Sequence, residues 1–371
     1  MKKPNIVLVL LDGARWDRLG ESLDFMDVSK EGTLLNNVNT AIPYTIGAVN
    51  VLFSGRYGKD NGIDAYYKMF RLKESIKILP EFLKEENYFT ACDLLSEKII
   101  SKRGFDIHQF HDEYKDNLKI RHPEFLQKCF KEANGKPIFA FLHFTRIHTI
   151  TVSEILKKYE WDNKEFYKNK EENMVNYDKC FKEAGSYAKL ICDTIKKLGV
   201  EEETIIIFFS DHGTGIGERF GERNYGSFTY EETIRAFYLF LGTKIIKNRI
   251  SSNLRETIDI LPTILELIGN KTADLPGKSI SKFLTNEETK IEDKLYVYSE
   301  TGALQGPYPS PMEPNVFCIK NSKYKLIFLK TPNQWKLFDL KEDPKEQTDI
   351  INEKSEIVEE LKNKLLEWIQ R

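Results

Sequence analysis

Residues 5–13, NIVLVLLDG, decide the fold class of this chain. A short, continuous apolar run predicts a strand that is buried on both faces, as in the parallel sheets of α/β proteins. Asp12 follows the run directly, at the carboxyl end of the strand, where open α/β sheets bind their ligands. Asp12 is therefore a candidate metal ligand, although an aspartate before a glycine is also common in turns.

Two more apolar stretches, PIFAFLHF at 137–144 and TIIIFF at 204–209, predict strands of the same kind. Each is followed by charged or metal-ligating side chains: Arg146 and His148 after the first, Asp211 and His212 after the second. If the three strands are parallel neighbours, all these groups meet at one edge of the sheet. His143, inside the first of these stretches, is expected to be a packed core histidine.

The stretch PYTIGAVNVLFSGRYGKDNG, at 43–62, predicts a helix that begins at Thr45. The N-terminus of a helix offers free backbone N–H groups and a positive dipole end, which suit a phosphate or sulfate group. A hydroxyl placed there can attack such an ester. The alternative is that Thr45 is only a helix cap, since threonine is a good N-cap.

The rest of the chain predicts one α/β domain with a small addition. A second strand is expected at 88–95, and an amphipathic helix at 175–198. Short strands and a final helix after residue 290 predict an antiparallel subdomain, so the expected domains are 1–290 and 291–371. Residues 151–172 are expected to form a lid over the site. The His-x-x-His-Asp loop with His108, His111 and Asp112 is expected to be an exposed polar loop, and the alternative is that it binds metal.

Composition excludes several classes of protein. The chain has 371 residues, of which 41% are hydrophobic and 30% charged, as in globular proteins. A net charge of −2 gives no reason to expect nucleic acid as a partner. Five cysteines without a C-x-x-C motif argue against disulfides and thiolate metal sites. The longest apolar runs are too short for a signal peptide or a membrane span, so a cytoplasmic protein is expected, and a homo-oligomer is possible.

The strand ends define a candidate metal centre with the ligands Asp12, Thr45, Asp211 and His212. Oxygen ligands with one imidazole suit a single Mn²⁺, Zn²⁺, Ca²⁺ or Mg²⁺ ion without choosing among them. Such an ion would activate the Thr45 hydroxyl for attack on phosphorus or sulfur. The remaining candidates are His148 as an acid or ester-binding group, Arg146 as a charge-stabilising group, and Arg15 and Arg56 as substrate-binding groups.

These segments, in this order, resemble the sulfatase-like branch of the alkaline phosphatase superfamily. NIVLVLLDGARWDRLG is similar to the first strand of that family with its metal-binding acid, and FSDHG to its second metal motif. HFTRIH resembles the segment with a substrate-binding histidine, and Thr45 lies ten residues before Gly55, where the nucleophile belongs. The resemblance implies a three-layer α/β/α sandwich with a mostly parallel central sheet, and a hydrolase of phosphoric or sulfuric esters.

The chain departs from the sulfatase pattern at the nucleophile. Sulfatases carry Cys or Ser followed by x-Pro-x-Arg and convert that residue to formylglycine. Thr45 cannot become formylglycine, and the Pro and Arg are absent. Gly13 replaces the second of the usual paired acids, and the lysine expected before Tyr230 is also missing, so Arg219 or Arg223 is a possible substitute.

These departures favour phosphoric mono- or diester chemistry through a covalent Thr45 intermediate. The alternatives are a sulfuric ester hydrolase, a phosphoglycerol- or phosphoethanolamine-type transferase, and a catalytically silent glycan-binding relative. The expected substrate is a small molecule, or a glycan or lipid-headgroup ester.

Overall fold

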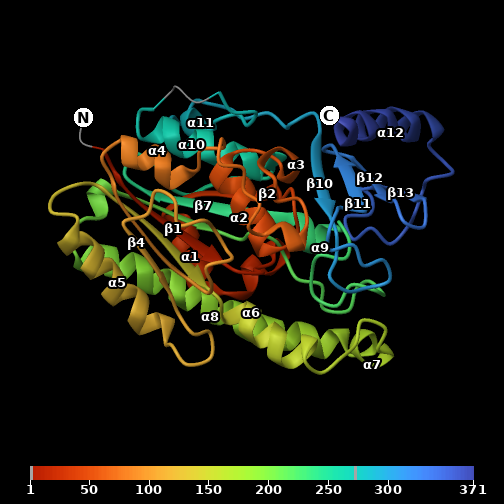
Figure 1. Ribbon diagram of the computed structural model, residues 1–371, viewed down its shortest axis with the longest axis horizontal. Coiled ribbons are helices and arrows are strands. Elements are labelled where there is room, and N and C mark those ends of the chain that lie inside the picture. The colour runs from red at the N-terminus through yellow and green to blue at the C-terminus, as the bar shows by residue number, and fades with distance from the viewer. Residues whose placement is uncertain (1–2, 271–273) are drawn as a thin grey trace.

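A computed structural model describes residues 3–270 and 274–371 (Figure 1). The strands of the main sheet are β1 Asn5–Leu11, β2 Gly32–Asn39, β3 Phe89–Leu94, β4 Ile107–Phe110, β5 Ile138–Phe144, β6 Thr204–Phe209, β7 Arg235–Gly242, β8 Arg249–Ser251 and β9 Arg255–Glu256. The α-helices are α1 Leu23–Lys30, α2 Thr45–Ser54, α3 Gly58–Asn61, α4 Leu79–Glu85, α5 Leu118–Glu132, α6 Arg146–Thr151, α7 Lys164–Lys168, α8 Lys170–Lys197, α9 Glu231–Ile234, α10 Ile260–Leu267, α11 Ser281–Thr285 and α12 Ser355–Gln370.

The main sheet has the strand order β4-β3-β5-β1-β6-β7-β2-β8, with β9 paired to β2. The central strands β5, β1 and β6 are parallel neighbours, as predicted. Leu11 pairs with Phe144 and Leu10 with Phe209, so the residues after these strands leave the sheet at the same edge. β7 is antiparallel to both β6 and β2, which makes the sheet mixed but mostly parallel.

Helices cover both faces of this sheet (Figure 1). Ile6, Leu8 and Leu10 of β1 pack into a core with residues of α2, α4 and α10. The alternate residues of β1, Val7, Val9 and Leu11, pack with residues of α1, α5 and α8 on the other face. Because successive side chains of a strand point to opposite faces of the sheet, β1 contributes residues to both apolar cores. The predicted three-layer α/β/α sandwich is confirmed.

The C-terminal sheet is small and antiparallel, in the order β10-β11-β12-β13. Its strands are β10 Val297–Thr301, β11 Val316–Lys320, β12 Tyr324–Leu329 and β13 Gln334–Asp339. One face packs on Leu361, Leu365 and Trp368 of α12, and the other on the segment that contains Phe228 and Ile234. The predicted antiparallel sheet and final helix are therefore present, and the exact boundary at 290/291 stays a prediction.

Two expectations about the surface need correction. The helix expected at 175–198 begins earlier, because α8 starts at Lys170. The segment expected to be a lid contains a π-helical turn at Val152–Leu156 and α7, and its role as a lid stays a prediction. The loop after β4 was expected to be exposed, but His111 is buried, because it lies against Asp93 of β3. Among the residues described, no helix is both long and apolar enough to cross a membrane.

Candidate active site

Asp12, Asp211 and His212 meet at the carboxyl edge of β1 and β6. Each offers one ligand atom, and these atoms all lie within 4.8 Å of one another. The backbone N–H of Gly13 donates to Asp211 Oδ1 at 3.2 Å, which ties the two strand ends together. His212 Nδ1 lies 2.7 Å from the carbonyl oxygen of Gly213, so Nδ1 carries the proton and Nε2 is left to face the carboxylates.

Thr45 joins this group from the start of α2. Its Oγ1 lies 3.4 Å from both carboxylate oxygens of Asp12 and 3.3 Å from His212 Nε2. Tyr44, not Thr45, occupies the N-cap position, and no side chain caps this helix. The side chain of Thr45 therefore does not serve as the cap, and its hydroxyl faces the acids and the imidazole.

The charges of this group fit a bound cation. Burial would raise the pKa of Asp12, but the imidazoles of His148, His143 and His212 favour its charged form and hold the pKa below its usual range. Burial raises the pKa of Asp211, and its Oδ2 has no hydrogen-bond donor among the described residues. Two adjacent buried carboxylates, one with an oxygen that lacks a donor, are a donor set that a divalent cation satisfies. Asp12, Asp211, His212 and Thr45 would hold that ion.

Two residues of the site were not identified from the sequence. His143 is fully buried, as expected of a core histidine, but its Nε2 also lies 2.8 Å from Asp12 Oδ2. Its Nδ1 accepts from the backbone N–H of Leu95, so Nε2–H donates to Asp12. Tyr225 places its ring centroid 4.3 Å from that of His212. The sequence could have indicated His143 by its position, one residue before the end of β5 and next to the strand that precedes Asp12. No sequence pattern indicated Tyr225.

His148 lies at the edge of the group, with Nδ1 3.9 Å from Asp12 Oδ2 and 3.4 Å from the hydroxyl of Tyr225. It is half-buried, at the start of α6. The predicted acid His148 therefore lies beside Asp12 without being one of the proposed ligands.

The three predicted arginines make other contacts. Arg15 is buried and pairs with Asp17 at 2.8 Å and with Glu218. Arg146 pairs on the surface with Glu183 at 3.0 Å, and Arg56 donates to the carbonyl oxygen of Asp274 at 3.1 Å. Within the described part of the chain, no hydrogen bond or ion pair joins any of them to the Asp12–Thr45–His212 group, so their substrate roles stay predictions.

A cavity of about 780 Å³ opens beside Tyr44 and Tyr225, the neighbours of Thr45 and His212. Its wall includes Arg223, whose guanidinium contacts Gln305 and a carbonyl oxygen but no carboxylate in the described residues. Asn224, also in the wall, has a φ of 127° and a buried side-chain amide without a partner in the described residues. A strained, unsatisfied amide of this kind is typical of a ligand-binding position.

Comparisons with known proteins identify the family of the chain. A family model described as Sulfatase matches residues 4–270, and a model described as N-sulphoglucosamine sulphohydrolase, C-terminal, matches residues 221–371. Among curated proteins, the low-salt glycan biosynthesis sulfotransferase Agl7 of Haloferax volcanii is 21% identical over 79% of this chain and 67% of its own length. An arylsulfatase of Clostridium perfringens is 23% identical over 94% of this chain and 90% of its own.

Solved structures share the fold. A 2-O GAG sulfatase superposes with a TM-score of 0.83 at 19% identity and covers 100% of this chain and 92% of its own. The phosphonate monoester hydrolase of Agrobacterium radiobacter has a TM-score of 0.75 at 14% identity, with coverage of 98% and 95%. The family model spans well over half of the sequence, and the chain thus belongs to the sulfatase family, whose members are hydrolases acting on sulfuric ester bonds.

Proposed function

We propose that this chain is a metal-dependent ester hydrolase in which Thr45 Oγ1 is the nucleophile, with sulfuric esters of glycans as the first substrate class. One observation carries the proposal: Thr45 Oγ1 lies within 3.4 Å of Asp12 and His212, the residues that would hold the ion. The family of the chain supports sulfur over the phosphorus chemistry that Thr45 alone favoured.

When bound, the divalent ion would lower the pKa of the Thr45 hydroxyl and neutralise the charge of the ester. Asp12 lies within reach of the hydroxyl proton. Oγ1 attacks sulfur, the Oγ1–S bond forms, and the bond from sulfur to the bridging oxygen breaks. His148, beside Asp12, donates a proton to that leaving oxygen. Water then attacks sulfur and gives one proton to His148, the Oγ1–S bond breaks, and hydrogen sulfate leaves. Asp12 returns to Oγ1 the proton that it took from the Thr45 hydroxyl.

The fixed backbone around Thr45 prepares this site for an anion. α2 has ten residues, all buried, and its first turn carries no acidic side chain. The free N–H groups of that turn lie at the residue that carries the nucleophile, where they would bind the non-bridging oxygens of the ester. His143 holds Asp12 in place through its Nε2–H.

The cavity beside Tyr44 supports a sugar as the alcohol of the ester. Tyr44, Tyr66, Trp161 and Tyr225 line it, and aromatic faces are suited to the apolar face of a sugar ring. The unsatisfied amide of Asn224 would bond to sugar hydroxyls. Two similar proteins, the glycan biosynthesis sulfotransferase Agl7 and the 2-O GAG sulfatase, are named for glycan substrates, which supports the same class.

A second candidate, phosphoric ester hydrolysis, is favoured by the identity of residue 45. A sulfo-threonine lacks the second hydroxyl by which formylglycine expels sulfate, so direct attack of water at sulfur is the route left to it. In-line attack of water is the ordinary route for a phospho-threonine. The similarity in fold to a phosphonate monoester hydrolase is compatible with this candidate. If an alcohol replaces water in the second step, the same site transfers the group rather than hydrolysing the ester.

The test is a panel of nitrophenyl sulfate, phosphate, phosphodiester and phosphonate substrates, each with Mn²⁺, Zn²⁺, Ca²⁺ or Mg²⁺. Thr45→Ala should lose at least about 10³-fold in turnover of the best substrate and should still bind metal. The matched control, Thr45→Ser, keeps the hydroxyl and should retain turnover. Acid quench and mass spectrometry should find the modified group on residue 45. Normal turnover by Thr45→Ala would remove Thr45 as nucleophile.

A further inference from the structure

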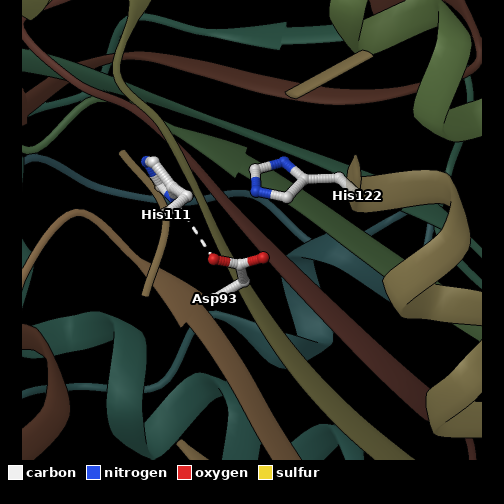
Figure 2. A group of neighbouring side chains, drawn as sticks. All are labelled: Asp93, His111 and His122. Atoms are coloured by element: carbon white, nitrogen blue, oxygen red, sulfur yellow. Dashed lines mark hydrogen bonds and ion pairs between the residues drawn. The ribbon is translucent and has the colours of Figure 1, made fainter. Parts of the chain in front are cut away.

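A second group of metal-binding side chains lies next to the active site. Asp93 of β3, His111 after β4 and His122 of α5 are buried together, at 0%, 4% and 0% exposure (Figure 2). One ligand atom from each can be chosen so that all lie within 4.8 Å of one another. They come from three separate elements, so the fold and not local sequence brings them together.

The outward-facing atoms of this triad are already held by neighbours. Asp93 Oδ2 accepts from Arg121 Nε at 2.6 Å and from Gln109 Nε2 at 3.0 Å. His122 Nδ1 lies 2.5 Å from the hydroxyl of Tyr187, and His111 Nε2 lies 3.5 Å from Thr145 Oγ1. Such contacts to the far atoms of metal-ligating side chains fix their orientation and tautomer.

The inward-facing atoms remain for a ligand. Asp93 Oδ1 and His111 Nδ1 lie 3.0 Å apart. His122 Nε2 is buried without a hydrogen-bond partner in the described residues, and Figure 2 shows its ring directed toward Asp93 and His111. A buried, unpaired imidazole nitrogen is costly, since burial of a polar atom needs a compensating partner.

We propose that Asp93, His111 and His122 form a second site for a divalent transition-metal ion, with Zn²⁺ as the ion that two imidazoles and one carboxylate suit best. Asp93 Oδ1, His111 Nδ1 and His122 Nε2 bind the ion. On binding, the proton that His111 Nδ1 donates to Asp93 Oδ1 moves to Nε2, which faces Thr145 Oγ1, so His111 binds the ion as a neutral imidazole. Arg121 and Gln109 keep their bonds to Asp93 Oδ2.

This site is separate from the one at Asp12 but adjoins it. The ring centroids of His111 and His143 are 6.1 Å apart, and His143 in turn donates to Asp12. An ion at the triad would join β3, the end of β4 and α5. It would also fix the position of His111, whose ring lies beside that of His143. Its role is structural, because all three ligands are buried away from the cavity beside Tyr44.

The experiment counts zinc in the full chain. In Asp12→Asn/Asp211→Asn, which empties the active site, Zn²⁺ titration after chelation should give one equivalent and a raised melting temperature. Adding His122→Gln should remove that equivalent. The matched control, His108→Gln, changes a nearby histidine outside the triad. That variant should still bind one equivalent of Zn²⁺. Circular dichroism verifies that each variant is folded.

Zinc that stays bound after His122→Gln, or a folded Asp12→Asn/Asp211→Asn chain that binds none, would overturn the proposal. If the His122→Gln variant does not fold, the visible absorption of Co²⁺ bound to Asp12→Asn/Asp211→Asn tests the proposal. Visible absorption typical of four-coordinate cobalt with nitrogen ligands supports the triad, and the weak spectrum of hydrated cobalt contradicts it. These readouts need no turnover, so they do not depend on the proposed activity.

Discussion

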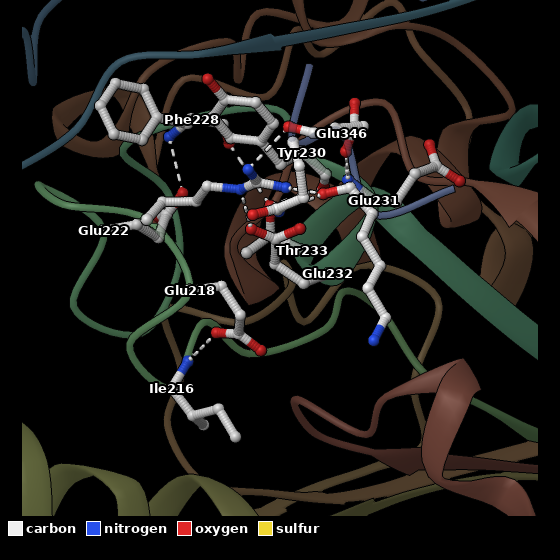
Figure 3. A network of polar contacts seen from close by, with 12 residues as sticks. Ile216, Glu218, Glu222, Phe228, Tyr230, Glu231, Glu232, Thr233 and Glu346 are labelled. Atoms are coloured by element: carbon white, nitrogen blue, oxygen red, sulfur yellow. Dashed lines mark hydrogen bonds and ion pairs between the residues drawn. The ribbon is translucent and has the colours of Figure 1, made fainter. Parts of the chain in front are cut away.

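Two groups of buried charges differ in how they are balanced. Where the C-terminal sheet meets the main domain, Glu231 pairs with Lys320 at 2.8 Å and with Lys325 at 3.1 Å, and Glu346 pairs with Lys325 at 2.7 Å. Figure 3 shows Glu231, Glu232 and Glu346 lying close together in this network. Here two lysines neutralise the carboxylates of Glu231 and Glu346.

At the carboxyl edge of β1, by contrast, the ion-pair partners of Asp12 and Asp211 among the described residues are all imidazoles. In each group one carboxylate has a lowered pKa, Glu231 beside the lysines and Asp12 beside the imidazoles. Burial raises the pKa of the other carboxylate, Glu346 to about 7 and Asp211 above its usual range, so the groups differ in the kind of partner and not in these directions. A balanced buried group stabilises the fold by its own contacts, whereas an unbalanced one needs a ligand. The contrast separates structural charges from functional ones.

The largest effect is expected where the unbalanced group is changed. Asp211→Asn should reduce turnover by about 10³-fold, since a metal contributes several kcal/mol of charge stabilisation. The metal-free variant should be at least as stable as the metal-free wild type, because one of two adjacent carboxylates is gone. Turnover, metal content and denaturant unfolding test this. Asp112→Asn, in an exposed loop, is the control, and a strongly destabilised metal-free Asp211→Asn would contradict the comparison.

The balanced group should respond in the opposite way. Lys325→Met should lower the free energy of unfolding by about 3–5 kcal/mol, because Glu231 and Glu346 lose the cation between them. Metal binding should be unchanged. Urea unfolding measures the loss, and Lys323→Met, on the exposed lysine beside Asp339, should change stability by less than about 1 kcal/mol. Equal stabilities of the two variants would show that the buried lysine is not needed.

An intermediate effect is expected at Glu300 of β10, which has no ion-pair partner in the described residues. Burial raises its pKa from 4.5 to about 8. Below pH 4.5 both states are protonated. Above it the unfolded chain releases a proton that the folded chain retains, so stability falls until about pH 8. Relative to Glu300→Gln, the wild type should lose a few kcal/mol across this window.

Unfolding curves at several pH values for wild type, Glu300→Gln and the exposed control Glu313→Gln measure that difference. A wild type and Glu300→Gln that follow parallel pH profiles would show that Glu300 titrates normally in the folded chain.

The smallest effect is expected at the surface. Arg146 and Glu183 are both about half exposed, and such pairs contribute about 0–1 kcal/mol. Arg146→Ala should therefore leave the melting temperature nearly unchanged. A large loss of turnover with normal stability would restore the catalytic role predicted for Arg146; an unchanged rate would assign it to the surface.

The sequence predicted the parts of this fold that depend on apolar patterning. The runs in β1, β5 and β6 are long enough to identify buried parallel strands, and their ends located Asp12, Asp211 and His212. The burial of His111 was missed, because it depends on contacts with β3 and α5 that no local pattern encodes. Tyr225 was missed for the same reason, since its loop has neither helical nor strand periodicity.

Gly13 makes one departure from the family pattern hard to reverse. Its φ is +71°, in the left-handed region, and a β-carbon added there would stand 2.9 Å from Thr214 Oγ1. An aspartate introduced at position 13 would need a strained backbone and a displaced Thr214 before it could serve as a second acid. A single substitution in this loop therefore cannot produce a paired-acid centre, and any design that seeks one must rebuild positions 13 and 214 together.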